Sequence, residues 1–206
     1  MSDVPRSMEA TSPAEVARVS ARRTAHPNGW WGMLMLIATE ASLFGTLFAT
    51  YFYLRFQTKP WPPGGIAAPS TVVPLILTGV LVATSAPMQV AASAARRGRL
   101  GLLRLALLAA LVVQCGYFAM QMHLFMSDLD KFSPQLSAYG SIYFTLLGAD
   151  HAHVFVGILL NLWLLARLAG GITNYRATGV VAVSFYWHFV NLLTLFVVGT
   201  ILSPAT

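Results

Sequence analysis

The sequence predicts an all-α polytopic membrane protein, built as a single bundle of five transmembrane helices. Hydrophobic residues make up 56% of the 206 residues and charged residues only 10%, whereas soluble domains contain about 25% charged residues. Five apolar stretches are each long enough to cross a hydrocarbon layer of about 30 Å as a helix. The predicted spans are residues 30–54, 72–95, 102–126, 141–168 and 179–202.

The first 28 residues differ from the rest of the chain. They are rich in arginine and small polar residues and contain no apolar core, so they predict a flexible tail with a short amphipathic helix near residues 14–23 and no cleaved signal peptide. Residues 29–206 are expected to form one transmembrane domain.

Basic residues are distributed unequally between the two sides of the predicted bundle. The side of the amino terminus collects ten of them: Arg6, Arg18, Arg22, Arg23, Arg96, Arg97, Arg99, Arg104, Arg167 and Arg176. The other side has three: Arg55, Lys59 and Lys131. Because cytoplasmic loops carry the excess of Lys and Arg, the amino terminus is predicted to be cytoplasmic. This topology accounts for the net charge of +6 without a nucleic-acid partner.

Glu40 is the only glutamate in any predicted span. An ionisable residue at this depth is a candidate functional site, and we expect it to pack against a neighbouring helix or a lipid. A proton path would need further carboxylates, and only Asp150 lies at a similar depth.

Two other spans contain local features. Pro87 follows Thr84 and Ser85 in the second span, which predicts a kink whose free backbone groups are partly satisfied by the hydroxyls. Cys115, the single cysteine, lies in the third span. It cannot form an internal disulfide, and we expect it to be a buried small apolar residue.

The fourth span carries Asp150, His151 and His153 near its middle. Asp150, His153 and Gly157 are separated by three and four residues, which places them on one helix face, whereas His151 needs another partner. Carboxylate and imidazole groups can bind a metal, with His123 or His188 as further ligands. We favour a hydrogen-bonded polar cluster between helices, because intramembrane polar groups usually pair with one another.

The fifth span contains Trp187, His188 and Asn191. His188 and Asn191 are three residues apart and share a face, so they are expected to meet Glu40, the fourth-span cluster or lipid headgroups. The sequence shows no nucleophile–base pair, phosphate-binding glycine loop or cysteine–histidine metal spacing, and an independent catalytic centre is not expected.

Together these stretches resemble subunit III of the haem-copper oxidases, the family of cytochrome c and quinol oxidases. The first span, WWGMLMLIATEASLFGTLFATYFYL, places Glu40 at the family's intramembrane glutamate. The matches continue in family order through Tyr139-Gly140-Ser141, His153-Val154 with Gly157, and Tyr186-Trp187-His188-Phe189-Val190. The chain departs from the family pattern at Asp150-His151, where His-Gly is usual, at Asn191 in place of Asp, and at Leu124 in place of Glu.

The resemblance implies a short five-helix bacterial form in the plasma membrane, packed on the catalytic subunit I and on subunit II. It implies that haem and copper belong to those partners and that this chain holds phospholipid, supports proton uptake and protects the complex during turnover. The polar residues expected to fix helices or lipid are Glu40, Asp150, His153, Trp187, His188 and Asn191.

Three other interpretations stay open from the sequence. The chain could be a subunit III homologue of a nitric oxide reductase. It could be a small proton-coupled transporter that uses Glu40 and Asp150. A third possibility is a membrane metalloprotein with Asp150, His151 and His153 as ligands.

Overall fold

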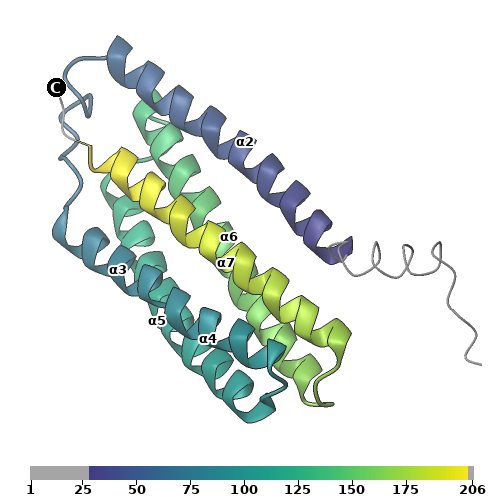
Figure 1. Cartoon of the computed structure of the whole chain (residues 1–206). Coiled ribbons are helices and arrows are strands. Elements are labelled where there is room, and N and C mark those ends of the chain that lie inside the picture. Colours follow the sequence, from purple (N-terminus) through teal and green to yellow (C-terminus); the bar gives the residue numbers. More distant parts are fainter. Residues whose placement is uncertain (1–27, 204–206) are drawn as a thin grey trace, which may run out of the picture.

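The computed structural model describes residues 28–203, and all regular secondary structure in that range is helical (Figure 1). Except for Asn28, the predicted tail of residues 1–28 lies outside the described range. This includes the amphipathic helix predicted near residues 14–23. The helices are α2 (Asn28–Gln57), α3 (Val72–Ala83), α4 (Ser85–Arg96), α5 (Leu100–Lys131), α6 (Ala138–Leu168) and α7 (Asn174–Ile201).

The five predicted spans are confirmed. Between residues 28 and 203, five stretches are long and apolar enough to cross a membrane, with α3 and α4 together forming the second. Several helices extend beyond the predicted spans. Helix α6 begins at Ala138 because the Ser137 side chain accepts a hydrogen bond from the Gly140 amide at 3.0 Å, and α7 begins at Asn174 after the equivalent cap by Thr173. Polar caps therefore set the helix ends, whereas hydropathy indicates only the apolar part.

The predicted break in the second span is confirmed. Helix α3 ends at Ala83 and α4 begins at Ser85. The Thr84 amide donates to the Leu81 carbonyl at 3.0 Å, and the Met88 amide donates to the Thr84 carbonyl at 3.3 Å. Pro87 has no amide hydrogen for the intervening turn, which explains why the helix is interrupted here.

Helix α7 is the centre of the bundle. It packs against α2, α3, α4 and α6, whereas among the helices of residues 28–203 α2 contacts only α6 and α7. Figure 1 shows α2 along one side of the bundle, joined to α3 by a long connection near the end of α7. Helix α2 consequently leaves large apolar side chains exposed, among them Trp31, Met35 and Leu43.

The expectation that Cys115 is buried was wrong, because this side chain is exposed. Its neighbours Gln114 and Tyr117 are the residues of this turn that face the bundle, with exposed fractions of 0% and 3%. Both faces of a membrane helix can be apolar, so hydropathy alone does not distinguish the protein-facing side from the lipid-facing side.

Candidate functional site

Glu40 on α2 and His153 on α6 form the most prominent polar contact between spans. The Glu40 Oε2 atom lies 2.8 Å from His153 Nε2, and both side chains are largely buried, with exposed fractions of 23% and 14%. Phe44, one helical turn after Glu40, packs edge-on against the imidazole with the ring centroids 5.2 Å apart. Glu40 thus meets the fourth span, as expected of a carboxyl group packed against a neighbouring helix.

The hydrogen bonds of His153 fix how many protons this pair holds. Its Nδ1 atom lies 2.7 Å from the Ala149 carbonyl oxygen, and because a carbonyl oxygen only accepts, Nδ1 carries a proton. The Nε2–Oε2 contact then needs one further proton, either on the Glu40 carboxyl or on the imidazole. Both arrangements have zero net charge, so neither leaves an uncompensated charge in the bundle.

Asp150 and His151 form hydrogen bonds with other groups than this pair. Asp150 accepts a hydrogen bond from Thr194 Oγ1 on α7 at 2.7 Å. The His151 Nδ1 atom donates to the Leu147 carbonyl oxygen at 2.5 Å, and its Nε2 atom is buried without a hydrogen-bond partner. The residues predicted to share a face have different partners: Asp150 binds α7 and His153 binds α2.

This divergence bears on the metalloprotein interpretation. Nowhere in residues 28–203 do three His, Cys, Asp or Glu side chains converge as a metal site would require. Asp150, His151 and His153 instead contact Thr194, Leu147 and Glu40 respectively.

The three candidates on α7 bind the second span. Trp187 Nε1 donates to Thr84 Oγ1 at 2.7 Å, and Asn191 Nδ2 donates to Ser85 Oγ at 2.7 Å. His188 Nε2 lies 3.4 Å from Gln89 Oε1 on α4. Of the three alternatives expected for His188 and Asn191, the described residues show no hydrogen bond to Glu40 or to the fourth-span cluster, and contact with lipid headgroups stays a prediction. The break at Thr84 and Ser85 instead presents two hydroxyls to α7.

Two polar groups near the ends of the spans were not predicted from the sequence. Asp128 Oδ2 accepts from the Tyr143 hydroxyl at 2.7 Å, and Asp128 Oδ1 accepts from Lys131 Nζ at 2.8 Å. The three-residue spacing of Asp128 and Lys131 was a usable signal for their ion pair. The spacing gives no indication of Tyr143, which comes from another helix.

The second missed group surrounds Arg167 at the end of α6. Its guanidinium carbon lies 5.1 Å from the Trp163 ring centroid and 5.6 Å from that of Tyr175, so the cation is held between two aromatic faces. These residues line a cavity of about 290 Å³ together with Arg176. The four-residue spacing of Trp163 and Arg167 could have indicated the first contact.

Comparison with known proteins identifies the family of this bundle. The sequence matches the model of cytochrome c oxidase subunit III over residues 20–203. The chain belongs to the cytochrome c oxidase subunit III family. A probable cytochrome c oxidase subunit 3 of Mycobacterium leprae is 34% identical over 79% of this chain and 81% of the relative. A similar protein of Nocardia farcinica is 31% identical over 82% of this chain and 85% of the relative.

The relatives also include a subunit of a quinol oxidase. The cytochrome bo(3) ubiquinol oxidase subunit 3 of Pseudomonas aeruginosa is 29% identical over 82% of this chain and 83% of the relative. The resemblance seen in the sequence is thus confirmed, and the chain is a multi-pass membrane member of the haem-copper oxidase subunit III family.

Proposed function

We propose that this chain is an accessory subunit of a bacterial haem-copper terminal oxidase, with no catalytic centre of its own. In this role it binds phospholipid, packs on the catalytic subunit I and on subunit II, and sustains proton uptake and turnover by the catalytic subunit. Haem and copper belong to the partner subunits. Family membership supports the assignment, and the Glu40–His153 pair is the observation that carries the proton-related role.

The Glu40–His153 pair suits a proton-related role because of its composition. It holds a proton between a carboxyl oxygen and an imidazole nitrogen 2.8 Å apart, within the membrane-spanning part of α2 and α6. The proton can move from one partner to the other without changing the net charge of the pair, so the pair can hold a proton within the membrane-spanning part. Asp150 is bonded to Thr194 instead, and no hydrogen bond joins the two carboxyl groups.

Phospholipid binding is supported by the surroundings of Arg167. Two aromatic rings hold its guanidinium, and the adjacent cavity is also lined by Arg176. From the distribution of basic residues, this end of the bundle faces the cytoplasm, where Arg and aromatic side chains commonly meet lipid headgroups. The exposed apolar surface of α2 and the other spans suits lipid or a partner's helices.

The remaining interpretations have less support. The relatives described above are subunits of oxidases, which favours an oxidase over a nitric oxide reductase. Asp150 and Glu40 bond different partners, which weighs against a two-carboxylate transporter, and the separate partners of Asp150, His151 and His153 weigh against a metal site.

The substitution Glu40→Ala in the assembled oxidase tests this function. We expect an unchanged haem spectrum and initial rate but fewer turnovers before the enzyme inactivates, because the shared proton is lost. His153→Ala should give the same phenotype, and the double substitution should be no worse than either single one, since the two residues act as a unit. The measurement is product formed per complex until activity ceases.

Two further variants separate proton exchange from packing. Glu40→Gln retains the shape and a hydrogen-bonding amide but cannot exchange a proton, and we expect it to behave like Glu40→Ala. Ser42→Ala is the control, because the exposed Ser42 hydroxyl bonds only the Ala38 carbonyl of its own helix. A Glu40→Gln enzyme that lasts as long as the unmodified enzyme would refute the proton role, and loss of haem in Glu40→Ala would refute the accessory role.

A further inference from the structure

A groove lies between α4 and the start of α5, and two arginines line it. Its volume is about 390 Å³, within the range of 300–1,000 Å³ that is usual for small-molecule sites. Arg97 and Arg99 line one end, beside the turn that joins the two helices, and the remaining lining includes Ala86, Val90 and Leu102. From the distribution of basic residues, this turn lies where the second and third spans meet the cytoplasm.

The backbone of the turn places both arginines at the same end of the groove. Gly98 separates them and has a φ of 67°. The Arg99 amide donates to the Ala94 carbonyl at 3.0 Å, which closes α4 with a glycine in the left-handed conformation. The two guanidinium groups therefore belong to one short, hydrogen-bonded turn.

These two arginines have no counter-ion. The sequence contains no Asp or Glu between residues 85 and 104. Both side chains are exposed, and neither guanidinium forms an ion pair or hydrogen bond with any of residues 28–203. Arg104 and Arg176, at the same end of the bundle, instead donate to backbone carbonyl groups. The groove thus contains two positive charges that the described part of the chain does not neutralise.

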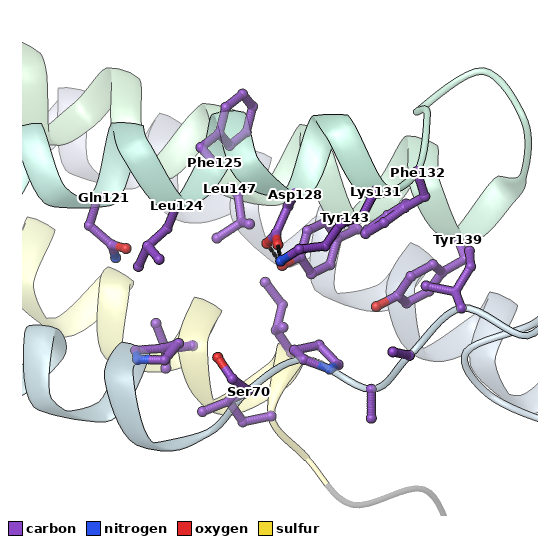
Figure 2. A pocket seen from close by; sticks show the side chains of 18 of the residues that line it. Ser70, Gln121, Leu124, Phe125, Asp128, Lys131, Phe132, Tyr139, Tyr143 and Leu147 are labelled. Carbon is purple, nitrogen blue, oxygen red and sulfur yellow. Dashed lines mark hydrogen bonds and ion pairs between the residues drawn. The ribbon is translucent and has the colours of Figure 1, made fainter.

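A larger cavity, of about 620 Å³, shows the opposite situation (Figure 2). It lies near the other end of α5, where Asp128 and Lys131 line it and form an ion pair at 2.8 Å. The Tyr143 hydroxyl donates to the second Asp128 oxygen at 2.7 Å. The charges of this cavity are paired with each other, so they do not indicate a charged ligand, whereas those of the groove beside α4 do.

Hydrogen-bond donors continue from the arginines into the membrane-spanning part. Gln89, Ser93 and Arg97 all line the groove, and their spacing of four residues places them on one face of the helix. The Gln89 amide oxygen lies 3.4 Å from His188 Nε2. The Gln89 NH2 group and the Ser93 hydroxyl donate to no atom of residues 28–203. At 1.5 Å per residue, Ser93 and Gln89 lie roughly 6 and 12 Å deeper than Arg97.

We propose that this groove binds a phospholipid of net negative charge from the cytoplasmic leaflet, such as phosphatidylglycerol. Its phosphate lies between Arg97 and Arg99. Its ester carbonyl oxygens, which only accept hydrogen bonds, receive them from Ser93 and Gln89. The acyl chains continue along the exposed apolar surface of α4 and α5.

Two features of the groove favour this ligand. Charged groups, uncharged donors and apolar side chains follow one another with depth, in the order of the phosphate, esters and acyl chains of a phospholipid. A zwitterionic phospholipid adds an ammonium group, for which the groove offers no carboxylate, whereas a net negative lipid neutralises the arginines. The site is separate from the surroundings of Arg167 and does not depend on the role of Glu40 in turnover.

Photolabelling of the purified complex that contains this chain, in nanodiscs, tests the proposal. The probes are phosphatidylglycerol and phosphatidylcholine with the same diazirine close to one ester, and mass spectrometry quantifies the label on residues 86–102. At equal mole fractions, we expect phosphatidylglycerol to label this segment at least about fivefold more than phosphatidylcholine. Equal labelling would indicate ordinary lipid solvation, and absence of labelling by both probes would indicate that a partner subunit covers the groove. Either result would overturn the proposal.

Four variants locate the site. Arg97→Gln and Arg99→Gln should each lower labelling by phosphatidylglycerol about fivefold, the effect of one basic residue near an anionic lipid surface. Arg96→Gln is the matched control, because Arg96 is also exposed but does not line the groove. An equal loss in Arg96→Gln would show a general attraction to basic residues and refute the site. Val90→Trp fills the groove and leaves the arginines intact, so unchanged labelling in this variant would show that the lipid lies elsewhere.

Discussion

Asp150 illustrates how a polar side chain is accommodated within the membrane. It is 1% exposed, and Thr194, which is 0% exposed, donates a 2.7 Å hydrogen bond to it from the neighbouring helix. His153, Trp187 and Asn191 each have a comparable partner on another helix. At the residue scale, the polar groups of the spans act chiefly as specific contacts between particular helix pairs.

The substitution Thr194→Val tests this view at a single bond. It preserves the side-chain shape and removes the donor to Asp150, so the free energy of unfolding is expected to fall by about 1–2 kcal/mol. Unfolding by dodecyl sulfate in mixed micelles measures the change. Thr145→Val is the matched control, because the exposed Thr145 hydroxyl bonds only the Ser141 carbonyl of its own helix. Equal losses in the two variants would contradict the prediction.

At the scale of elements, α6 and α7 are held by a close approach at Gly157. A Cβ atom at this position would lie 2.6 Å from the Cε3 atom of Trp187 and would also overlap Cζ3. The indole is itself fixed by its bond to Thr84 on the second span. Gly157, Trp187 and Thr84 therefore link α6, α7 and the break between α3 and α4.

Gly157→Ala is expected to destabilise the bundle by about 1–3 kcal/mol, because the buried indole cannot move without disturbing three spans. The same unfolding measurement applies. Gly148→Ala on the same helix has no atom within 4 Å of the added Cβ, and it should be neutral or stabilising by up to about 1 kcal/mol, since alanine favours the helix. A stability loss confined to Gly148→Ala would contradict this account of the packing.

At the scale of the whole molecule, the spans alternate in direction and segregate the charged ends. The segment between α4 and α5 contains Arg97 and Arg99, whereas α5 and α6 are joined on the other side by residues 132–137. Ten basic residues against three predict that the first of these sides is cytoplasmic. The cavity lined by Arg167 would then lie on the cytoplasmic side of the membrane.

Single-cysteine labelling can test this orientation. In a Cys115→Ala background, Gln135→Cys should react with a membrane-impermeant maleimide in intact spheroplasts, whereas Arg97→Cys should react only after permeabilisation. Both positions are exposed, so access to the reagent rather than burial decides the result. The reverse pattern of labelling would place the amino terminus outside.

The sequence was informative about each span but much less so about which residues of other helices each side chain contacts. Hydropathy located all five spans, and Pro87 with Thr84 and Ser85 located the break. The motif containing Glu40 indicated the family together with those of the fourth and fifth spans. The sequence did not reveal that Cys115 faces outward, that Asn191 bonds Ser85, or that Tyr143 reaches Asp128. Helical spacing relates residues of one helix, whereas each of these features depends on how separate helices are rotated and placed.

By itself, the sequence determined that this chain crosses a membrane five times, because the transfer of apolar residues into lipid is largely additive along a span. Only the tertiary structure decided that His153 binds Glu40 while Asp150 binds Thr194, and that the His151 Nε2 atom is buried without a hydrogen-bond partner. These outcomes depend on directional hydrogen bonds between helices distant in sequence, and such bonds exist only once the helices have packed.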